Sequence, residues 1–371
     1  MRVRSIALAA TTTAAVLALS ACGGGSSTTG SGGGGGGAAG GATEGGGSDS
    51  PQVGVILPDT ESSARWESFD APLLQQAFDD AGVTATIQNA QGDASNMQTI
   101  ADQMITQGVA VLAIVNLDSD SGAAIQAKAE QAGVQTIDYD RLTLGGTADY
   151  YVSFDNTRVG ELQGEGLATC LGDQPTDIAY LDGSPTDNNA TLFAAGAHSV
   201  LDPMTQYTVV AEQAVPEWDN QQAATIFEQM LTQSGSIGGV LAANDGLGNA
   251  AISILAKNGL NGQVPVTGQD ATVQGLQNIL AGDQCMSVYK AVTKEAQALS
   301  ETAISLIGGE EPETTGTVTD ETGGREVASI LLEPQSIFRD NVKDVVDDGA
   351  VTAEELCTEK FADACAELGI S

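Results

Sequence analysis

Histidine is nearly absent from this chain of 371 residues, and three common catalytic motifs are missing. The one histidine, His198, lies in a predicted helix away from the end of every predicted strand, which favours a structural or surface role. No GxSxG elbow, P-loop or HExxH pattern occurs, so the usual signatures of nucleophilic, phosphate-binding and zinc sites are lacking. We therefore predict a protein with no catalytic residues, no bound metal and no cofactor.

Two segments imitate ligand-binding motifs without completing them. DSDSG (118–122) spaces its acids like a calcium loop, but no glutamate closes the twelve-residue pattern, which favours a solvated loop. The glycine tract before Ala38 satisfies GxGxxG, yet no strand precedes it. Neither segment predicts a metal or dinucleotide site.

Basic residues are scarce. The chain has 13 Lys and Arg against 49 Asp and Glu, a formal charge of -36. Such a negative field repels phosphate backbones and anionic lipids, so it disfavours binding to nucleic acid or to a membrane surface. It is compatible with a neutral or cationic ligand.

The chain also lacks an apolar run long enough to span a membrane. The apolar segment 6–19 follows Arg2 and Arg4 and ends in Leu-Ser-Ala-Cys, which predicts a signal peptide over 1–21. Leu-Ser-Ala-Cys resembles a lipobox, in which Cys22 is lipidated and becomes the mature N-terminus; an ordinary secretory signal with an incidental cysteine is the alternative. Residues 22–50 are rich in Gly, Ser and Thr and predict a tether that spans about 30 Å on average. We expect an exported protein, anchored to the outer face of the membrane only by this lipid.

Four cysteines remain after Cys22, namely Cys170, Cys285, Cys357 and Cys365. An even number in an exported chain favours two disulfides, and three pairings are possible. We favour Cys170 with Cys285 and Cys357 with Cys365, because the second pair would staple the C-terminal tail. CxxC spacing is lacking, which disfavours zinc.

From residue 52 onward, short apolar runs alternate with longer amphipathic stretches, a pattern typical of parallel strands covered by helices. The expected strands are 53–57, 83–88, 110–115, 134–138, 177–181, 207–212, 239–243, 264–267, 286–289 and 327–332. The main expected helices are 65–81, 95–107, 157–171, 189–201, 221–232, 247–258, 273–281, 294–306 and 353–368, and 308–324 is an exposed crossing. The alternation forms two series, which predicts an α/β fold with two sheets, two lobes and a cleft between them.

Polar residues gather just beyond the carboxyl ends of the expected strands, where ligands of open α/β sheets bind. Their amide, carboxylate and guanidinium groups can donate and accept in fixed directions, as the hydroxyls of a sugar require. The two tryptophans, Trp66 and Trp218, fall one in each predicted lobe and could stack on the apolar faces of a sugar ring. For either one alone, a partly buried core or lid position is the alternative.

Seven segments together resemble the D-xylose-binding periplasmic protein family. They occur in the family's order and are SSARW (62–66), YDR (139–141), SFDN (153–156), GSPTDNNA (183–190), AND (243–245), GQDA (268–271) and VYK (288–290).

This resemblance implies a type I periplasmic-binding fold, with two Rossmann-like lobes of parallel sheets joined by a three-segment hinge. We assign the first lobe to 51–154 plus 291–325 and the second to 155–290 plus 326–371. It also implies a monomeric binding protein that closes on a monosaccharide, D-xylose first, and delivers it to the permease of an ABC importer. The carried-over ligand-binding residues are Arg65, Trp66, Asp140, Arg141, Asp187, Asn189, Trp218, Asn244, Asp270 and Lys290.

The loop 58–66 departs from the xylose-binding pattern, because it lacks the paired acids and the extra basic residue of the enteric protein. SSARW is more similar to a receptor for several aldoses, so a broader sugar pocket that accepts glucose, galactose or arabinose is the first alternative. A glycoside-cleaving enzyme that uses Asp187 and Asp270 is a remote one. A transcriptional regulator of the same fold is contradicted by the export signal and by the lack of an N-terminal helix-turn-helix.

Overall fold

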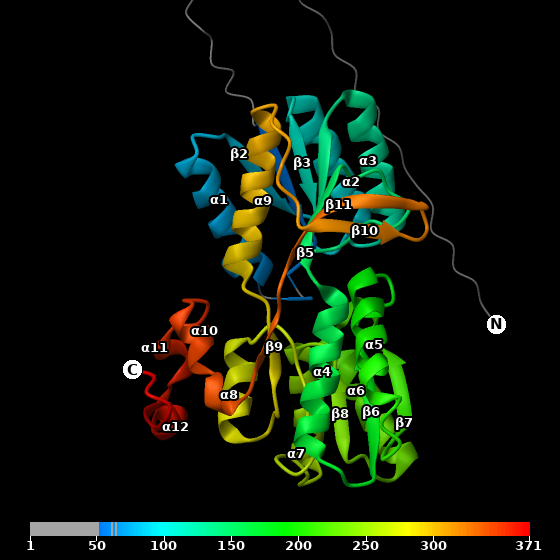
Figure 1. The fold of residues 1–371 in the computed structure, drawn as a ribbon, viewed down its shortest axis with the longest axis vertical. Coiled ribbons are helices and arrows are strands. Elements are labelled where there is room, and N and C mark those ends of the chain that lie inside the picture. Colours follow the sequence, from blue (N-terminus) through cyan, green and yellow to red (C-terminus); the bar gives the residue numbers. More distant parts are fainter. Residues whose placement is uncertain (1–51, 61, 64) are drawn as a thin grey trace, which may run out of the picture. The chain divides into compact units, whose positions relative to one another are not determined.

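The computed structural model describes residues 52–60, 62–63 and 65–371 (Figure 1). The predicted signal peptide, Cys22 and the tether 22–50 lie outside the described residues. Among the helices within the described ranges, none combines the length and the apolar character that a membrane span requires.

A seven-stranded sheet lies in the first lobe, with the order β10-β11-β5-β4-β3-β1-β2. All neighbouring pairs are parallel except β10 with β11. The strands are β1 (Val53–Leu57), β2 (Ala85–Asn89), β3 (Val111–Ile114), β4 (Gln135–Tyr139), β5 (Tyr150–Phe154), β10 (Gly316–Asp320) and β11 (Arg325–Leu332). The covering helices are α1 (Ala71–Asp80), preceded by the π-helical turn η1 (Trp66–Asp70), α2 (Ala94–Gln107), α3 (Ser119–Ala132) and α9 (Val292–Ile307).

The apolar residues of β1 explain why helices cover both faces of this sheet. Val53 and Val55 belong to one buried cluster with Leu74 of α1 and Leu299 of α9. Ile56 belongs to a second cluster with residues of α2 and α3. Because successive side chains of a strand point to opposite faces, a fully apolar strand must be buried on both.

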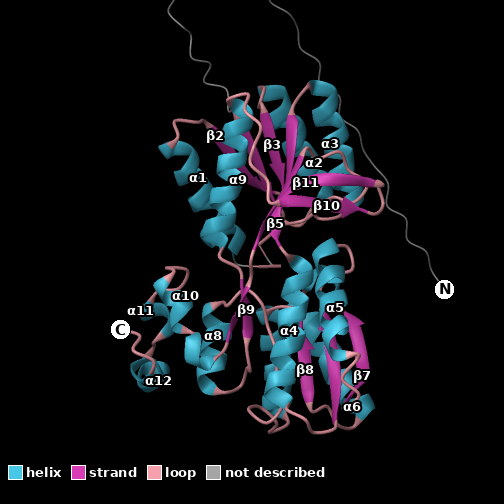
Figure 2. Ribbon diagram, viewed as in Figure 1, coloured by secondary structure: helices cyan, strands magenta, loops and turns pink. Residues whose placement is uncertain are grey.

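The second lobe contains a shorter parallel sheet, of order β7-β6-β8 (Figure 2). Its strands are β6 (Thr176–Asp182), β7 (Tyr207–Ala214) and β8 (Gly239–Ala242), and an antiparallel pair, β9 (Ser287–Tyr289) and β12 (Gln335–Ile337), lies beyond them. Single bridges, Val240 with Val266 and Gln269 with Val288, continue the sheet from β8 to β9, so the expected strand 264–267 is reduced to one bridge. The helices are α4 (Asn156–Leu171), α5 (Asn188–Leu201), η2 (Pro216–Trp218), α6 (Asn220–Ser234), α7 (Asp245–Lys257) and α8 (Val273–Ala281).

The C-terminal segment packs against α8 and β9 in a cluster of its own. The expected helix 353–368 is wrong as a single element, since Cys357 leaves helical geometry with φ −92° and ψ 47°. Both favoured disulfides are present, Cys170–Cys285 and Cys357–Cys365. The elements of this segment are η3 (Arg339–Asn341), α10 (Lys343–Asp347), α11 (Ala353–Leu356), η4 (Glu359–Phe361) and α12 (Ala362–Glu367).

The segment 308–332 corrects part of the sequence interpretation. Residues 308–324 were expected to cross between lobes, but β10 within them forms a hairpin with β11. β11 pairs with β5, so it belongs to the first lobe and the boundary at 325/326 is displaced to the end of β11. The strand β5 was not anticipated. The chain passes between the lobes three times, after β5, after β9 and after β11.

Candidate functional site

All ten predicted ligand-binding residues line one cavity, which we call the inner cavity. It is narrow, with about 30 Å³ of space that admits the centre of a water molecule. The structure thus brings together residues that are as far apart in sequence as Arg65 and Lys290. The structure shows that these residues lie close together, whereas their contact with a ligand stays a prediction.

The inner cavity lies at the carboxyl ends of strands from both sheets. Asp140 and Arg141 follow β4, Asp187 follows β6, Asn244 follows β8 and Lys290 follows β9. Parallel strands end at a common edge of the sheet, so residues that follow different strands become neighbours. This is the arrangement that the sequence pattern predicted.

Most N–H donors of Arg65 are bonded to acidic side chains. Its Nε and Nη2 donate to the two carboxylate oxygens of Asp70 at 2.8 and 2.7 Å, and its Nη1 donates to Asp140 Oδ2 at 2.9 Å. Nη2 also donates to Glu295 Oε2 at 2.5 Å. Because a guanidinium has five N–H donors, these four bonds leave one for a ligand.

Asp70 and Glu295 were missed by the sequence analysis, although both are fully buried beside the cavity. Each lies within a helical stretch whose pattern carries no signal of a buried acid. Burial raises the pKa of Glu295 to about 8, which the attraction of Arg65 only partly offsets. Its Oε1 is buried without a hydrogen-bond partner among the described residues, so this oxygen is the one placed to carry the proton.

Asp140 and Lys290 bring charges from the two lobes together. Lys290 Nζ lies 3.8 Å from Asp140 Oδ2 and 3.5 Å from Asp270 Oδ1. Burial acts to raise the pKa of Asp140, but Lys290, Arg65 and Arg141 together lower it below its ordinary value. Burial acts to lower the pKa of Lys290, but Asp140 and Asp270 raise it. Both groups therefore remain charged at neutral pH.

Asn189 also bonds to Asp140 from the second lobe, and its polar atoms have protein partners. Its Nδ2 donates to Asp140 O at 2.9 Å and Oδ1 at 3.2 Å, while its Oδ1 accepts from Asn156 Nδ2 at 2.9 Å. Asn244 differs, because among the described residues only its Oδ1 has a side-chain hydrogen-bond partner, the N–H of Leu247 at 2.8 Å. Asn244 therefore presents an amide to the cavity, whereas Asn189 mainly positions Asp140.

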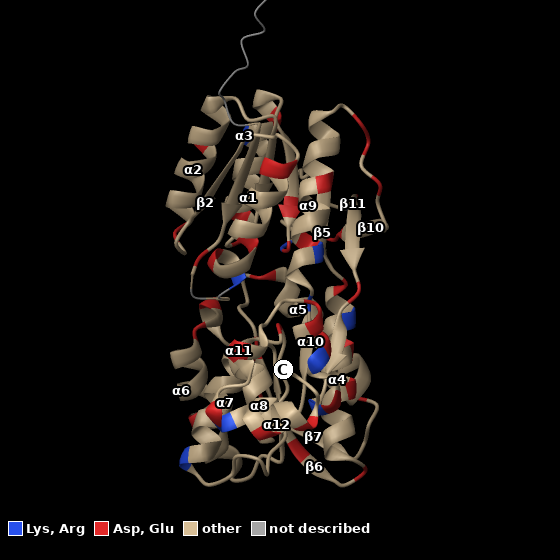
Figure 3. Ribbon diagram, turned by 90° about the vertical axis from the view of Figure 1, so that its left-hand side faces the viewer, with Lys and Arg blue, Asp and Glu red and all other residues tan. Residues whose placement is uncertain are grey.

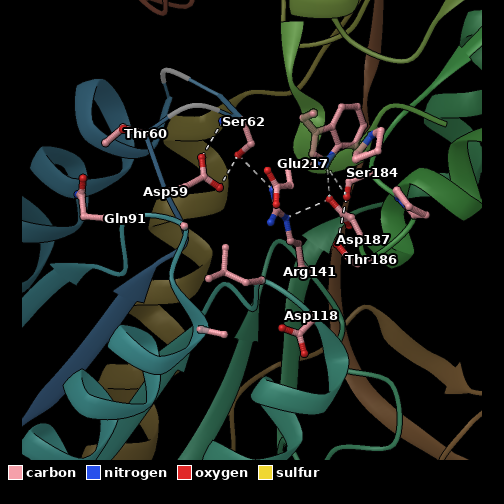
Figure 4. Close-up of a pocket in the computed structure, with 16 residues that line it drawn as sticks. Asp59, Thr60, Ser62, Gln91, Asp118, Arg141, Ser184, Thr186, Asp187 and Glu217 are labelled. Atoms are coloured by element: carbon pink, nitrogen blue, oxygen red, sulfur yellow. Dashed lines mark hydrogen bonds and ion pairs between the residues drawn. The ribbon is translucent and has the colours of Figure 1, made fainter. Parts of the chain in front are cut away.

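Arg141 and Asp187 join the lobes at the edge of the inner cavity (Figure 4). Arg141 Nε lies 3.1 Å from Asp187 Oδ2, and its Nη2 donates to Ser62 Oγ at 3.3 Å. Asp187 also begins α5, where its Oδ1 accepts from the N–H of Asn189 at 2.9 Å. This carboxylate is therefore held in place by its own helix.

The two tryptophans differ in the freedom of their ring faces. Trp218 donates from Nε1 to Asp187 Oδ2 at 3.2 Å, and its indole packs against the backbone of Gly183, where a Cβ would lie 2.0 Å from Cη2. Guanidinium carbons of Arg65 and Arg141 lie over the Trp66 ring, 4.4 and 5.7 Å from its centroid. Because these cations compete for its π face, Trp66 is the weaker stacking candidate. The predicted sandwich by both rings stays a prediction.

Four further residues line the inner cavity that the sequence analysis did not commit to, namely Ser62, Ser63, Phe193 and Gln269. Ser62 and Gln269 lie within quoted motifs or beside a strand end, so a signal existed for them. Phe193 lies in an apolar stretch of α5 that is typical of a core. His198, in the same helix, is not among the lining residues; it pairs with Asp202 and Glu212 and stacks on Tyr180.

The charges around the inner cavity include more acids than bases. Arg65, Arg141 and Lys290 face five acids, Asp70, Asp140, Asp187, Asp270 and Glu295. The excess resembles that of the whole chain, in which acidic residues are spread over both lobes (Figure 3). Such a site suits a neutral, hydroxyl-bearing ligand better than an anion.

Known proteins are similar to this chain over most of its length. A periplasmic binding protein domain matches residues 53–311. The D-xylose-binding periplasmic protein of Escherichia coli is 34% identical over 310 residues, 82% of this chain and 92% of that protein. The multiple sugar-binding periplasmic receptor of Rhizobium radiobacter is 32% identical, over 83% of this chain and 93% of the receptor.

Among solved structures, a carbohydrate transporter solute-binding protein from Chloroflexus aurantiacus in complex with D-glucose has a TM-score of 0.76. It is 28% identical, and the match covers 82% of this chain and 98% of that one.

Proposed function

Since the chain belongs to the periplasmic binding protein family, with a type I periplasmic-binding fold, we propose that it captures a monosaccharide in the inner cavity and delivers it to an ABC importer. The observation that carries the proposal is the convergence of Arg65, Asp140, Asp270 and Lys290 with Trp218 on one cavity that both lobes line. Charged groups of fixed direction bind hydroxyls, and the indole packs on the C–H face of a sugar ring.

D-xylose is the sugar that we propose first, because the relatives from Escherichia coli and Haemophilus influenzae bear that name at 34% and 33% identity. A broader aldose receptor is the second candidate, and one observation favours it. Ser62 and Ser63 line the inner cavity from the loop 58–66, which lacks the paired acids and the extra basic residue of the xylose-binding pattern. Small neutral side chains leave space for the hydroxymethyl group that distinguishes a hexose from a pentose.

Ligand binding would stabilise the form in which both lobes contact the sugar. Asp140 lies on the first lobe and Lys290 on the second, so only a closed form presents both to one ligand. A ligand that binds one form more tightly shifts the population toward it. The closed form would then be the one that the permease recognises.

We also propose that the protein is exported, acts as a monomer and is held to the membrane only through lipidated Cys22. Leu-Ser-Ala-Cys and the following Gly- and Ser-rich segment support this proposal. The relatives with assigned roles are binding proteins, which supports a function without catalysis.

A calorimetric panel on the mature protein tests the function. D-xylose, D-glucose, D-galactose and L-arabinose are titrated separately, with D-mannitol as a polyol that has no ring. We expect saturable, one-to-one binding of at least one aldose and none of mannitol. Binding of xylose alone supports the narrow site, and comparable binding of several aldoses supports the broad one. If no aldose binds, the proposed function is wrong.

A further inference from the structure

A second, much larger cavity adjoins the inner cavity, and we call it the outer cavity (Figure 4). About 670 Å³ of it admits the centre of a water molecule, against about 30 Å³ of the inner cavity. Ser62, Arg141, Asp187 and Trp218 line both, so these side chains form the boundary between them. Ligand pockets usually measure about 300 to 1,000 Å³, so the outer cavity has the size of a ligand site in its own right.

Positive φ angles are concentrated on the walls of the two cavities. Six non-glycine residues among those described have positive φ, and of these Asp140, Trp218 and Asp270 line the inner cavity. Gln91 (57°) and Glu217 (56°) line the outer cavity, as Trp218 also does. Non-glycine residues in this conformation cost free energy and cluster at functional sites. The outer cavity is lined by as many non-glycine residues with positive φ as the inner cavity.

The outer cavity also presents polar groups from both lobes. Gln91 follows β2 of the first lobe, and Glu217 lies in η2 of the second. Their backbone N–H groups are bonded, to Asn89 Oδ1 and Ser184 Oγ. Within the described part of the chain, the amide of Gln91 and the carboxylate of Glu217 have no hydrogen-bond partner. Both are therefore available to the hydroxyls of a ligand.

Arg141 lies where a substituent would pass from one cavity to the other. Its Nη1 donates to the carbonyl of Asn116 and its Nη2 donates to Ser62 Oγ, while Nε forms an ion pair with Asp187 at 3.1 Å and no hydrogen bond among the described residues. One N–H of Nη1 and one of Nη2 remain for an oxygen at the boundary. Arg141 is also the only Lys or Arg that lines the outer cavity, among the described residues, whereas Asp59, Asp118, Asp187 and Glu217 line it with carboxylates. This balance disfavours a phosphorylated or acidic substituent.

We propose that the outer cavity is a subsite for a second sugar unit, so that the protein binds a neutral disaccharide with one ring in each cavity. The proposal rests on the proposed function, because it takes the inner cavity as the site of the first ring. Trp218 borders both rings, Arg141 meets the oxygen that links them, and Gln91 and Glu217 bind the hydroxyls of the second ring.

Calorimetry on the mature protein tests the subsite, with D-xylose against β-1,4-xylobiose and D-glucose against cellobiose. We expect at least one disaccharide to bind as tightly as its monosaccharide or more tightly. Gln91→Ala and Glu217→Gln should each weaken disaccharide binding by roughly three- to tenfold, the loss of one hydrogen bond, and leave monosaccharide binding within about twofold. Glu228→Gln, an exposed glutamate of α6 outside both cavities, is the matched control and should change neither.

The outcomes separate this proposal from the function on which it rests. If monosaccharides bind and both disaccharides bind at least about a hundredfold more weakly, the subsite is wrong and the proposed function stands. If only disaccharides bind, the subsite stands and the site is not one for free monosaccharides. If nothing in the panel binds, both are wrong. Equal loss of monosaccharide and disaccharide affinity in the two variants, with unchanged thermal unfolding, would also overturn the subsite.

Discussion

Gly183→Ala tests whether the position of Trp218 controls sugar affinity. Gly183 has no left-handed φ, so alanine there meets crowding and not backbone strain. The new Cβ would lie 2.0 Å from Cη2 of Trp218 and 2.2 Å from Cζ2, where ordinary contacts begin near 3.4 Å. The indole must therefore move away from Gly183 by about 1.4 Å.

The expected loss of sugar affinity can be bounded by the cost of overpacking at Gly183 and by the cost of removing the indole. Overpacking a well-packed site costs roughly 1 to 3 kcal/mol, which we expect to divide between stability and affinity. Complete removal of the ring in Trp218→Ala should cost roughly 2 to 4 kcal/mol of binding, about 30- to 900-fold in Kd. Gly183→Ala should thus weaken aldose binding by less than Trp218→Ala but by more than about fivefold.

Calorimetry with the tightest-binding aldose, combined with thermal unfolding, provides the assay. Gly183→Ala in the Trp218→Ala background should have no further effect on affinity, since the clash is gone. Gly316→Ala is the control glycine, because an added Cβ there meets no atom within 4 Å. If Gly183→Ala binds like the wild type while Trp218→Ala does not, or if its effect persists without the indole, the reasoning is refuted.

Three further predictions concern charge and export. Asp270→Asn should weaken aldose binding in calorimetry by roughly tenfold, because Lys290, 3.5 Å away, loses an anionic partner. Unchanged affinity would show that Asp270 is not part of the binding site. Burial raises the pKa of Glu295 to about 8 from its ordinary 4.5, so the folded state retains a proton that the unfolded state loses, and stability falls as pH rises from about 5 to 8. Thermal unfolding across that range should show a smaller decline for Glu295→Gln than for the wild type, and equal slopes would contradict a raised pKa. Cys22→Ser should move the exported protein from the membrane fraction to the soluble one, and retention in the membrane fraction would exclude the lipid anchor.

The alternation of strands and helices could be predicted from the sequence because it follows from local physics. Apolar runs such as Val53–Leu57 must be buried on both faces, and amphipathic stretches such as Ala94–Gln107 need one face covered. Elements that depend on distant partners were missed or misjudged. β5 was missed, and β10 was assigned to a crossing between lobes. The strand over 327–332 was expected, but its place beside β5 is set by pairing across nearly 180 residues.

The sequence by itself determined an α/β chain of two lobes, and its motifs brought ten candidate ligand residues together by resemblance to one family. Parallel strands end at a common edge of the sheet, so the polar residues that follow them could be identified from the sequence as candidates for the site. Only the tertiary structure decided which of those groups are already engaged: Asn189 on Asp140, and Arg65 on two acids that no pattern marks. Only it revealed the outer cavity beside the inner one. Burial, charge pairing and enclosed space are properties of neighbours in three dimensions, and sequence order does not record them.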